Sequence, residues 1–405
     1  MGRNAVRLKL RWQDADKFIS AVYSQDRVTG LTHDFYKYPA RFSPQFSRAA
    51  IDIFSRPGDL VVDPFVGGGT SLVEARTSGR LAIGTDISSL AIFVSRVKTR
   101  TYSGADIRYL EKWFQNLPEK LNLRQNTKQS DWWRDSGYFR NLDCQQTWAI
   151  RKSLELGVLH AARIRDKKRQ DFVRCVLLRS AQSALDGRKE IPSAGQFRNY
   201  VAQTAARMLD GAGDFARVAR KADRYSRSGG KNRTICLQSK AAGLADYVRT
   251  SGRSSPKLII TSPPYPGVHI LYHRWQVRGG RETPAPFWIA GKLDGSGETY
   301  YQMYALRAGL NCYYKGIQET FTSLRMVSSG QTTVVQLVAF SDPKEQLPRY
   351  LAAMESSGYQ ECLLSDHLDS SDGRLWRDIP GRKWHANKKG NLASSQEVVL
   401  IHRPK

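Results

Sequence analysis

The sequence is poor in cysteine and in long apolar runs. It contains five cysteines, an odd number, and no two of them have the spacing C-x-x-C. A disulfide framework and a cysteine-based zinc site are therefore both unexpected, and the seven histidines show no metal-ligand spacing. No segment reaches the roughly 18 uninterrupted apolar residues that a membrane span requires. These absences predict a soluble cytoplasmic protein with no metal site.

The sequence is also poor in acidic residues. It has 37 Asp and Glu against 63 Lys and Arg, which gives a net charge of +26. Basic residues are interleaved with aromatic ones in stretches such as WWRDSGYFRN and YHRWQVRGGR. Positive charge neutralises phosphates and aromatic rings stack on bases. The combination favours a nucleic-acid partner, although charge alone would also serve solubility.

The order of the patterns predicts one α/β domain interrupted by a helical insertion. Residues 1–100 and 233–405 contain short apolar runs such as LVVDPF and SPKLIITSPPY, which are typical of buried parallel strands, and helical periodicity follows them. Residues 101–232 lack such runs and show helical periodicity over the length of a small domain. This insertion is a candidate target-recognition region, or else a structural or dimerising lid.

The first motif that carries chemistry is DPFVGGGT, which follows a predicted strand. Its glycines let the backbone approach a ligand closely, and the next helix presents N-terminal N–H groups there. The spacing is not the dinucleotide G-x-G-x-x-G, and no P-loop lysine follows, which favours S-adenosylmethionine. Asp86 ends the next strand, where it would accept the ribose hydroxyls or serve as an acid at a helix N-terminus. The predicted cofactor-binding residues here are Asp63, Pro64, Phe65, Gly67, Gly69, Thr70, Asp86 and Ile87.

The second motif is ITSPPY, at the end of another predicted strand. Two prolines stiffen the loop and remove two backbone donors, while the carbonyls remain as acceptors. The Ser262 side chain and the Pro263 carbonyl would both accept hydrogen bonds from one NH₂ group, and Tyr265 would stack on a base. The predicted catalytic residues are Ser262, Pro263, Pro264 and Tyr265. A plain proline-rich turn is the alternative.

DPFVGGGT followed by TSPPY resembles the N4-cytosine/N6-adenine DNA methyltransferase family. HDFYKYPARFSPQF resembles the motif of that family which lines the methionine end of the cofactor, and this implies cofactor contacts from Tyr38, Pro39 and Phe42. The resemblance implies a doubly wound α/β fold with a mostly parallel seven-stranded methyltransferase sheet. Serine as the first residue of the catalytic motif resembles the cytosine-N4 branch.

One family feature is missing from this sequence. An acid often follows the third strand, near the adenine ring of the cofactor, but this region reads CLQSKAAGLAD. Gln238 or Ser239 would replace that acid, or Asp246 would act from the next helix.

The resemblance implies a site-specific DNA methyltransferase that acts on the N4 amine of a flipped cytosine in duplex DNA. A restriction-modification or defence system, with a cognate restriction enzyme as partner, is the expected setting. Methylation at carbon-5 of cytosine requires a nucleophilic cysteine, typically in a Pro-Cys pair, and the sequence has no such pair. The alternatives are an N6-adenine DNA methyltransferase, an RNA amino-methyltransferase, and an inactive DNA-binding module.

Two basic stretches are candidates for DNA contact. The first follows the catalytic loop directly, and the second lies in RDIPGRKWHANKKGN, near the end of the chain. The residues predicted to bind DNA are His273, Arg274, Trp275, Arg278, Arg281, Arg382 and Lys383. The alternatives are core aromatic residues in a solvated loop for the first stretch and a solvated basic surface for the second.

Overall fold

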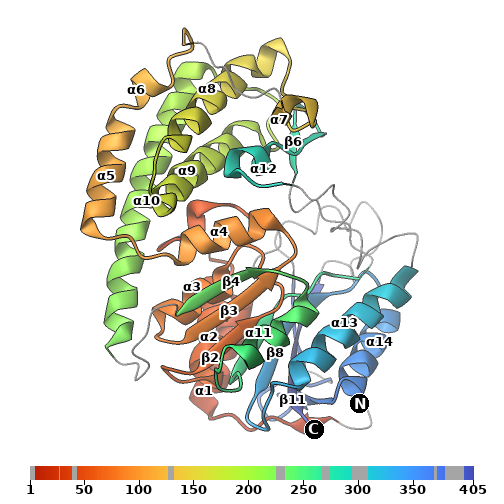
Figure 1. The fold of residues 1–405 in the computed structure, drawn as a ribbon. Coiled ribbons are helices and arrows are strands. Elements are labelled where there is room, and N and C mark those ends of the chain that lie inside the picture. The colour runs from red at the N-terminus through yellow and green to blue at the C-terminus, as the bar shows by residue number, and fades with distance from the viewer. Residues whose placement is uncertain are drawn as a thin grey trace.

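The fold is seen in a computed structural model of the chain (Figure 1). The structure describes residues 5–26, 28–38, 43–125, 132–224, 233–266, 274–293, 309–368, 372–378 and 396–405. Predicted site residues Pro39, Phe42, His273, Arg382 and Lys383 lie outside these ranges. Among the described residues, no helix is long and apolar enough to cross a membrane.

The centre of the fold is a mostly parallel sheet of nine strands in the described part of the chain, in the order β1-β9-β11-β8-β5-β2-β3-β4, with β10 beside β11. The strands are β1 (Val6–Arg7), β2 (Leu60–Asp63), β3 (Leu81–Asp86), β4 (Thr234–Gln238), β5 (Leu258–Thr261), β8 (Thr333–Ala339), β9 (Tyr359–Leu363), β10 (Leu375–Asp378) and β11 (Gln396–Pro404). Strand β11 is antiparallel to its neighbours β8, β9 and β10. The predicted α/β class with a mostly parallel sheet is confirmed, and β1 and β10 add two short strands to the seven expected.

Helices cover both faces of the sheet. One face packs against α1 (Trp12–Tyr23), α2 (Pro44–Phe54) and α3 (Thr70–Thr77), and the other packs against α11 (Leu244–Thr250), α13 (Gly309–Arg325) and α14 (Pro343–Ser356). Successive residues of β2 serve the two faces in turn, because side chains alternate along a strand. Val61 packs on the first face, whereas Leu60 and Val62 pack on the second.

All the named elements in the described part of residues 104–223 are helices, and these build a separate layer above the sheet in Figure 1. The helices are α5 (Gly104–Gln115), α6 (Leu117–Lys120), α7 (Trp132–Asp135), α8 (Gln145–Ala162), α9 (Lys167–Leu185) and α10 (Ala194–Asp223). Helix α4 (Ser89–Thr99) lies between the two layers and packs on both β4 and α9. Short 3₁₀ helices occur at His33–Phe35 and Ala241–Gly243.

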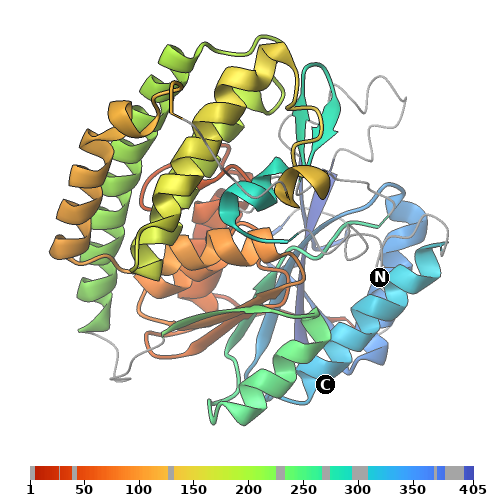
Figure 2. The ribbon, with the colours of Figure 1, turned by 45° about the horizontal axis from the view of Figure 1, so that its top comes forward.

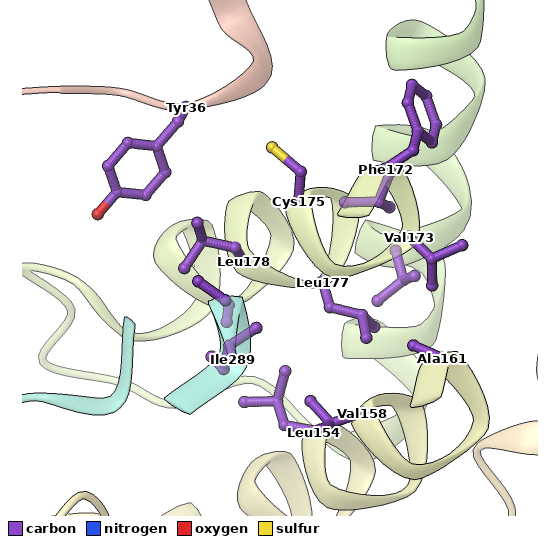
Figure 3. Close-up of a cluster of buried hydrophobic side chains, with 14 of the residues drawn as sticks. Tyr36, Leu154, Val158, Ala161, Phe172, Val173, Cys175, Leu177, Leu178 and Ile289 are labelled. Carbon is purple, nitrogen blue, oxygen red and sulfur yellow. The ribbon is translucent and has the colours of Figure 1, made fainter. Parts of the chain in front are cut away.

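The helical layer also takes up part of the segment that follows the catalytic loop. Strands β6 (Trp275–Val277) and β7 (Arg281–Thr283) form a hairpin, and α12 (Ala285–Ala290) follows it. Figure 2 shows the hairpin beside the helical layer, and α12 packs on α9 and α4. In Figure 3, side chains of α8, α9 and α12 meet in one apolar cluster, with Leu154, Leu178 and Ile289 among them. Residues 275–290 therefore pack with the insertion, not with the sheet.

A buried histidine in the sheet gives a testable pH dependence of stability. His402 on β11 is 1% exposed, and neither ring nitrogen has a hydrogen-bond partner among the described residues. Burial lowers the pKa of His402 to about 3, whereas the unfolded chain returns it to about 6.5. The unfolded state therefore binds the extra proton, and this contribution to stability, complete above about pH 6.5, is lost as the pH falls towards 3.

Replacing His402 with leucine removes this titration. The free energy of unfolding of His402→Leu minus that of the parent is expected to rise by about 2 kcal/mol between pH 8 and pH 5, at about 1.4 kcal/mol per pH unit below 6.5. Urea unfolding of both proteins at both pH values measures this difference. The titration of every other group contributes equally to the two proteins and cancels when one free energy is subtracted from the other. A difference that stays constant with pH would show that His402 does not titrate in this way.

Candidate active site

The glycine loop leaves the carboxyl end of β2 and turns sharply into α3. Gly67 and Gly69 have φ angles of +46° and +79°, a region that favours glycine. Tyr38 lies directly against the loop, because a Cβ added to Gly68 would stand 2.7 Å from the Cβ of Tyr38. The predicted methionine-side motif and the glycine loop thus meet. Together they form a cradle of bare backbone with one aromatic wall.

Helix α4 holds the glycine loop from behind. Lys98 is fully buried and its Nζ donates to the Gly68 carbonyl over 2.8 Å. Ser95 Oγ donates to the Gly67 carbonyl over 3.0 Å. Thr70, the first residue of α3, is buried, and its hydroxyl has no partner among the described residues. The carbonyls of Gly67 and Gly68 thus accept hydrogen bonds from helix α4. The Thr70 hydroxyl beside the loop is the group left without a partner among the described residues.

Asp86 stands at the end of β3, beside this loop. Its Oδ2 accepts the Gly67 N–H over 3.0 Å, and its Oδ1 accepts the Ser88 N–H over 2.8 Å. Burial raises the pKa of Asp86 to about 6. The predicted neighbour Gln238 pairs with Asp86 across β3 and β4 and is exposed, and Ser239 N–H donates to the Asp86 carbonyl. The sequence alternative Asp246 lies on α11, paired with Arg249.

Asp63 links the glycine loop to the second motif. Its Oδ1 accepts the Thr261 hydroxyl over 2.7 Å and the Phe65 N–H over 3.0 Å, and its Oδ2 accepts the Ser71 hydroxyl. Burial raises the pKa of Asp63 to about 6. Strands β2 and β5 are parallel neighbours, so their carboxyl ends open at one edge of the sheet. The two motifs therefore lie next to each other although 198 residues separate Asp63 from Thr261.

The Ser-Pro-Pro-Tyr loop follows β5 at this edge. Ser262 is half-buried and its Oγ donates to the Leu337 carbonyl over 3.0 Å. The Pro264 carbonyl accepts the Tyr313 hydroxyl over 2.9 Å, and Pro263 is buried. Tyr265 is only 4% exposed, and its hydroxyl donates to Glu397. The predicted stacking of a base on Tyr265 does not fit this burial, because the ring already packs in the core of the sheet.

The residues predicted to contact DNA divide into exposed and buried ones. Arg281 is exposed on the β6–β7 hairpin, and Arg274 is half-buried just before it. Arg278 is half-buried and donates to the Cys144 sulfur over 3.2 Å. The structure corrects the prediction for Trp275, which is 2% exposed and donates from its ring nitrogen to the Tyr36 hydroxyl. Its indole fills the core of the helical layer and is not accessible to a base or a phosphate.

Sequence reasoning missed several residues that shape the site. Lys98 and Ser95 hold the glycine loop, Thr261 joins the two loops, and Glu397 holds Tyr265. Only Thr261 had a signal in the sequence, since it begins the TSPPY motif. The others lie outside both motifs, and only the folded chain brings them there.

The cradle fits the cofactor that the motifs imply. Bare glycine backbone, a neighbouring aromatic ring and a carboxylate at the next strand end are the elements that a nucleoside-containing ligand uses in an open α/β sheet. The resemblance of the two motifs to the N4-cytosine/N6-adenine DNA methyltransferase family implies S-adenosylmethionine as that ligand. Gly67, Gly69, Thr70, Asp86 and Tyr38 are the residues that would hold it.

Parts of the chain are similar in sequence to known methyltransferases. The sequence model of the DNA methylase family of the N6/N4 type matches residues 3–93, which include the glycine loop and Asp86. A type II methyltransferase of Methanocaldococcus jannaschii, M.MjaII, is 33% identical over 104 residues, 26% of this chain and 18% of that protein. The type II methyltransferase M.MvaI of Kocuria varians is 39% identical over 72 residues, 17% of this chain and 16% of that protein. The matched stretches thus span less than a fifth of either curated relative.

Two solved structures have a low overall similarity to the chain. TrmN from Thermus thermophilus has a TM-score of 0.30 at 10% identity, covering 90% of this chain and 49% of that one. The rRNA methyltransferase aviRa from Streptomyces viridochromogenes also has a TM-score of 0.30 at 10% identity, covering 98% and 94%. Neither similarity reaches the level of a shared overall structure. The similarity to the DNA methylase family of the N6/N4 type thus covers residues 3–93, the part of the chain that carries the glycine loop and Asp86.

Proposed function

We propose that this chain is an S-adenosylmethionine-dependent DNA methyltransferase that modifies the exocyclic N4 amine of cytosine. One observation carries the proposal: the Thr261 hydroxyl bonds to Asp63, so the glycine loop and the Ser-Pro-Pro-Tyr loop open side by side. A methyl donor held on the first loop would face a base held on the second. The DNA methylase family model that matches residues 3–93 supports DNA as the substrate, and serine at position 262 favours cytosine over adenine.

The residues of the second loop would prepare the amine for attack. The lone pair of a cytosine amine is delocalised into the ring, which makes its nitrogen a poor nucleophile. Hydrogen bonds from its two N–H groups to Ser262 Oγ and the Pro263 carbonyl would draw the nitrogen towards tetrahedral geometry and free that lone pair. The bound cofactor would supply an electrophilic methyl group. Most of the rate enhancement would come from positioning and electrostatics.

The amine is paired inside a duplex, so we propose that the target base is flipped into the site. Phosphates of the duplex would lie along the basic surface, to which Arg281 on the hairpin and Arg278 beside it contribute. The helical layer of residues 101–232 stands next to this hairpin and is the proposed target-recognition region. A cognate restriction enzyme would cleave the same sequence when it is unmodified.

Incubation of purified protein with DNA, and separately with RNA, in the presence of deuteromethyl-labelled S-adenosylmethionine tests the proposal when mass spectrometry of the nucleosides follows. We expect labelled N4-methyldeoxycytidine. Labelled N6-methyldeoxyadenosine would move the activity to the adenine branch, and label that enters RNA but not DNA would overturn the DNA substrate. Absence of any labelled nucleoside would overturn the enzyme assignment.

A further inference from the structure

A chain of hydrogen bonds runs from the catalytic loop to the last strand of the sheet. The Ser262 hydroxyl has one proton and two acceptors within reach, the Leu337 carbonyl at 3.0 Å and the Tyr265 hydroxyl at 3.2 Å. Tyr265 in turn donates to Oε1 of Glu397 over 2.9 Å. Arg377 holds Oε2 of Glu397 with Nε and Nη2, each at 2.8 Å. Both side chains of this ion pair are largely enclosed, at 11% and 7% exposure.

The chemistry of its members fixes the direction of this chain. An arginine side chain only donates and an ionised glutamate only accepts. Because Glu397 is acceptor-only beside Arg377, the Tyr265 proton points at Glu397, and the Tyr265 oxygen presents only a lone pair to Ser262. The single Ser262 proton is left with two acceptors, the Leu337 carbonyl and the Tyr265 oxygen. The Ser262 proton therefore points back into the protein. Among the described residues no donor reaches Ser262 Oγ, so its lone pairs remain available on the other side.

We propose that Glu397 is a positioning residue which, through Tyr265, keeps Ser262 a hydrogen-bond acceptor for the target amine. This inference rests on the proposed function. A Ser262 proton that pointed into the site would bind the lone pair of the amine, which must stay free to attack the methyl carbon. A Tyr265 proton that pointed at Ser262 would occupy a lone pair that the amine needs. The buried carboxylate excludes the second arrangement by taking the Tyr265 proton, and the Leu337 carbonyl and the Tyr265 oxygen oppose the first by accepting the Ser262 proton.

Glu397→Gln reverses the direction while keeping the shape. The guanidinium of Arg377 would hold the amide oxygen of the new side chain, which turns its NH₂ group towards Tyr265. Tyr265 must then donate to Ser262. We expect kcat to fall about tenfold, the effect of about 1.4 kcal/mol in the transition state, while the KM for S-adenosylmethionine stays at the parental value.

Removing the phenol oxygen should rescue this variant. In Tyr265→Phe, Ser262 still donates to Leu337 and its lone pairs stay available, so we expect a smaller loss of kcat than in Glu397→Gln. The double variant Tyr265→Phe/Glu397→Gln has no phenol to donate to Ser262, and its kcat should return to that of Tyr265→Phe. If Glu397 only anchored the fold, the double variant would be at least as slow as Glu397→Gln.

Glu361→Gln is the matched control. Glu361 on the neighbouring strand β9 pairs with Arg374 through two bonds of 2.7 Å, and the two side chains are 10% and 12% exposed. Strands β11 and β8 lie between β9 and the strand β5 that carries the catalytic loop, so kcat should not change, while thermal unfolding monitors the cost of losing a buried carboxylate. Parental kcat in Glu397→Gln, or no rescue in the double variant, would overturn the inference. A parental protein that forms no N4-methylcytosine would instead overturn the proposed function.

Discussion

Replacing Ser262 with alanine is expected to lower kcat by about 100- to 1,000-fold, the usual cost of removing one preorganised hydrogen-bonding group from a transition state. The affinity for S-adenosylhomocysteine should stay close to the parental value, because the Ser262 hydroxyl bonds to Leu337 and Tyr265 and not to the glycine loop. Single-turnover methylation of DNA measures the rate, and isothermal calorimetry measures the affinity.

A control variant separates this effect from a general loss of structure. Ser251 is also half-buried and also donates to a backbone carbonyl, that of Val248, but it lies on the loop that leads into β5 from the far end of the strand. Ser251→Ala should keep the parental rate. Methylation by Ser262→Ala at the parental rate would remove Ser262 from the catalytic machinery.

The elements around the glycine loop were predictable because their signals are local. The apolar run LVVD forms β2, Ser88 caps α4 by accepting the Ala91 N–H, and Asp86 ends β3. The two motifs meet because β2 and β5 are parallel neighbours, and parallel neighbouring strands end at one edge of the sheet. Local sequence was sufficient wherever an apolar run, a cap and a glycine turn stood in succession.

The peripheral strands were not predictable in the same way. Strand β1 has two residues and pairs only with β9, and YQECL in β9 mixes polar and apolar residues without a long apolar run. Short strands take their stability from their neighbours, so their own sequence carries little signal. Glu397 is a similar case, because 132 residues separate it from its partner Tyr265.

Trp275 shows why the basic and aromatic stretch was misjudged in part. Aromatic residues among arginines suit a nucleic-acid surface, but a β-hairpin alternates its faces. Trp275 and Val277 point into the helical layer while Gln276 between them is exposed. The basic residues of this stretch did predict an exposed side chain at Arg281. The aromatic residue Trp275 instead packs in the core of the helical layer.

The second large effect is expected at Asp86, through the binding of the cofactor. Its carboxylate would accept the ribose hydroxyls only when ionised, and burial raises its pKa to about 6 in the free protein. The affinity for S-adenosylhomocysteine should therefore be constant above about pH 7 and fall about tenfold between pH 7.5 and pH 5 as Asp86 takes up a proton. Asp86→Asn should bind weakly at pH 7.5, by about tenfold or more, and should lose most of the pH dependence.

Asp186 provides the matched control for this titration. Burial raises its pKa as well, and its carboxylate accepts a backbone N–H from Gln276, but it lies in the helical layer at the end of α9. Asp186→Asn should keep both the parental affinity at pH 7.5 and the parental fall towards pH 5, measured by calorimetry in buffers of matched ionic strength. If Asp86→Asn binds as the parent does across this range, the ribose is held elsewhere. The glycine loop would then contact the cofactor without help from Asp86, whose carboxylate accepts the Gly67 N–H.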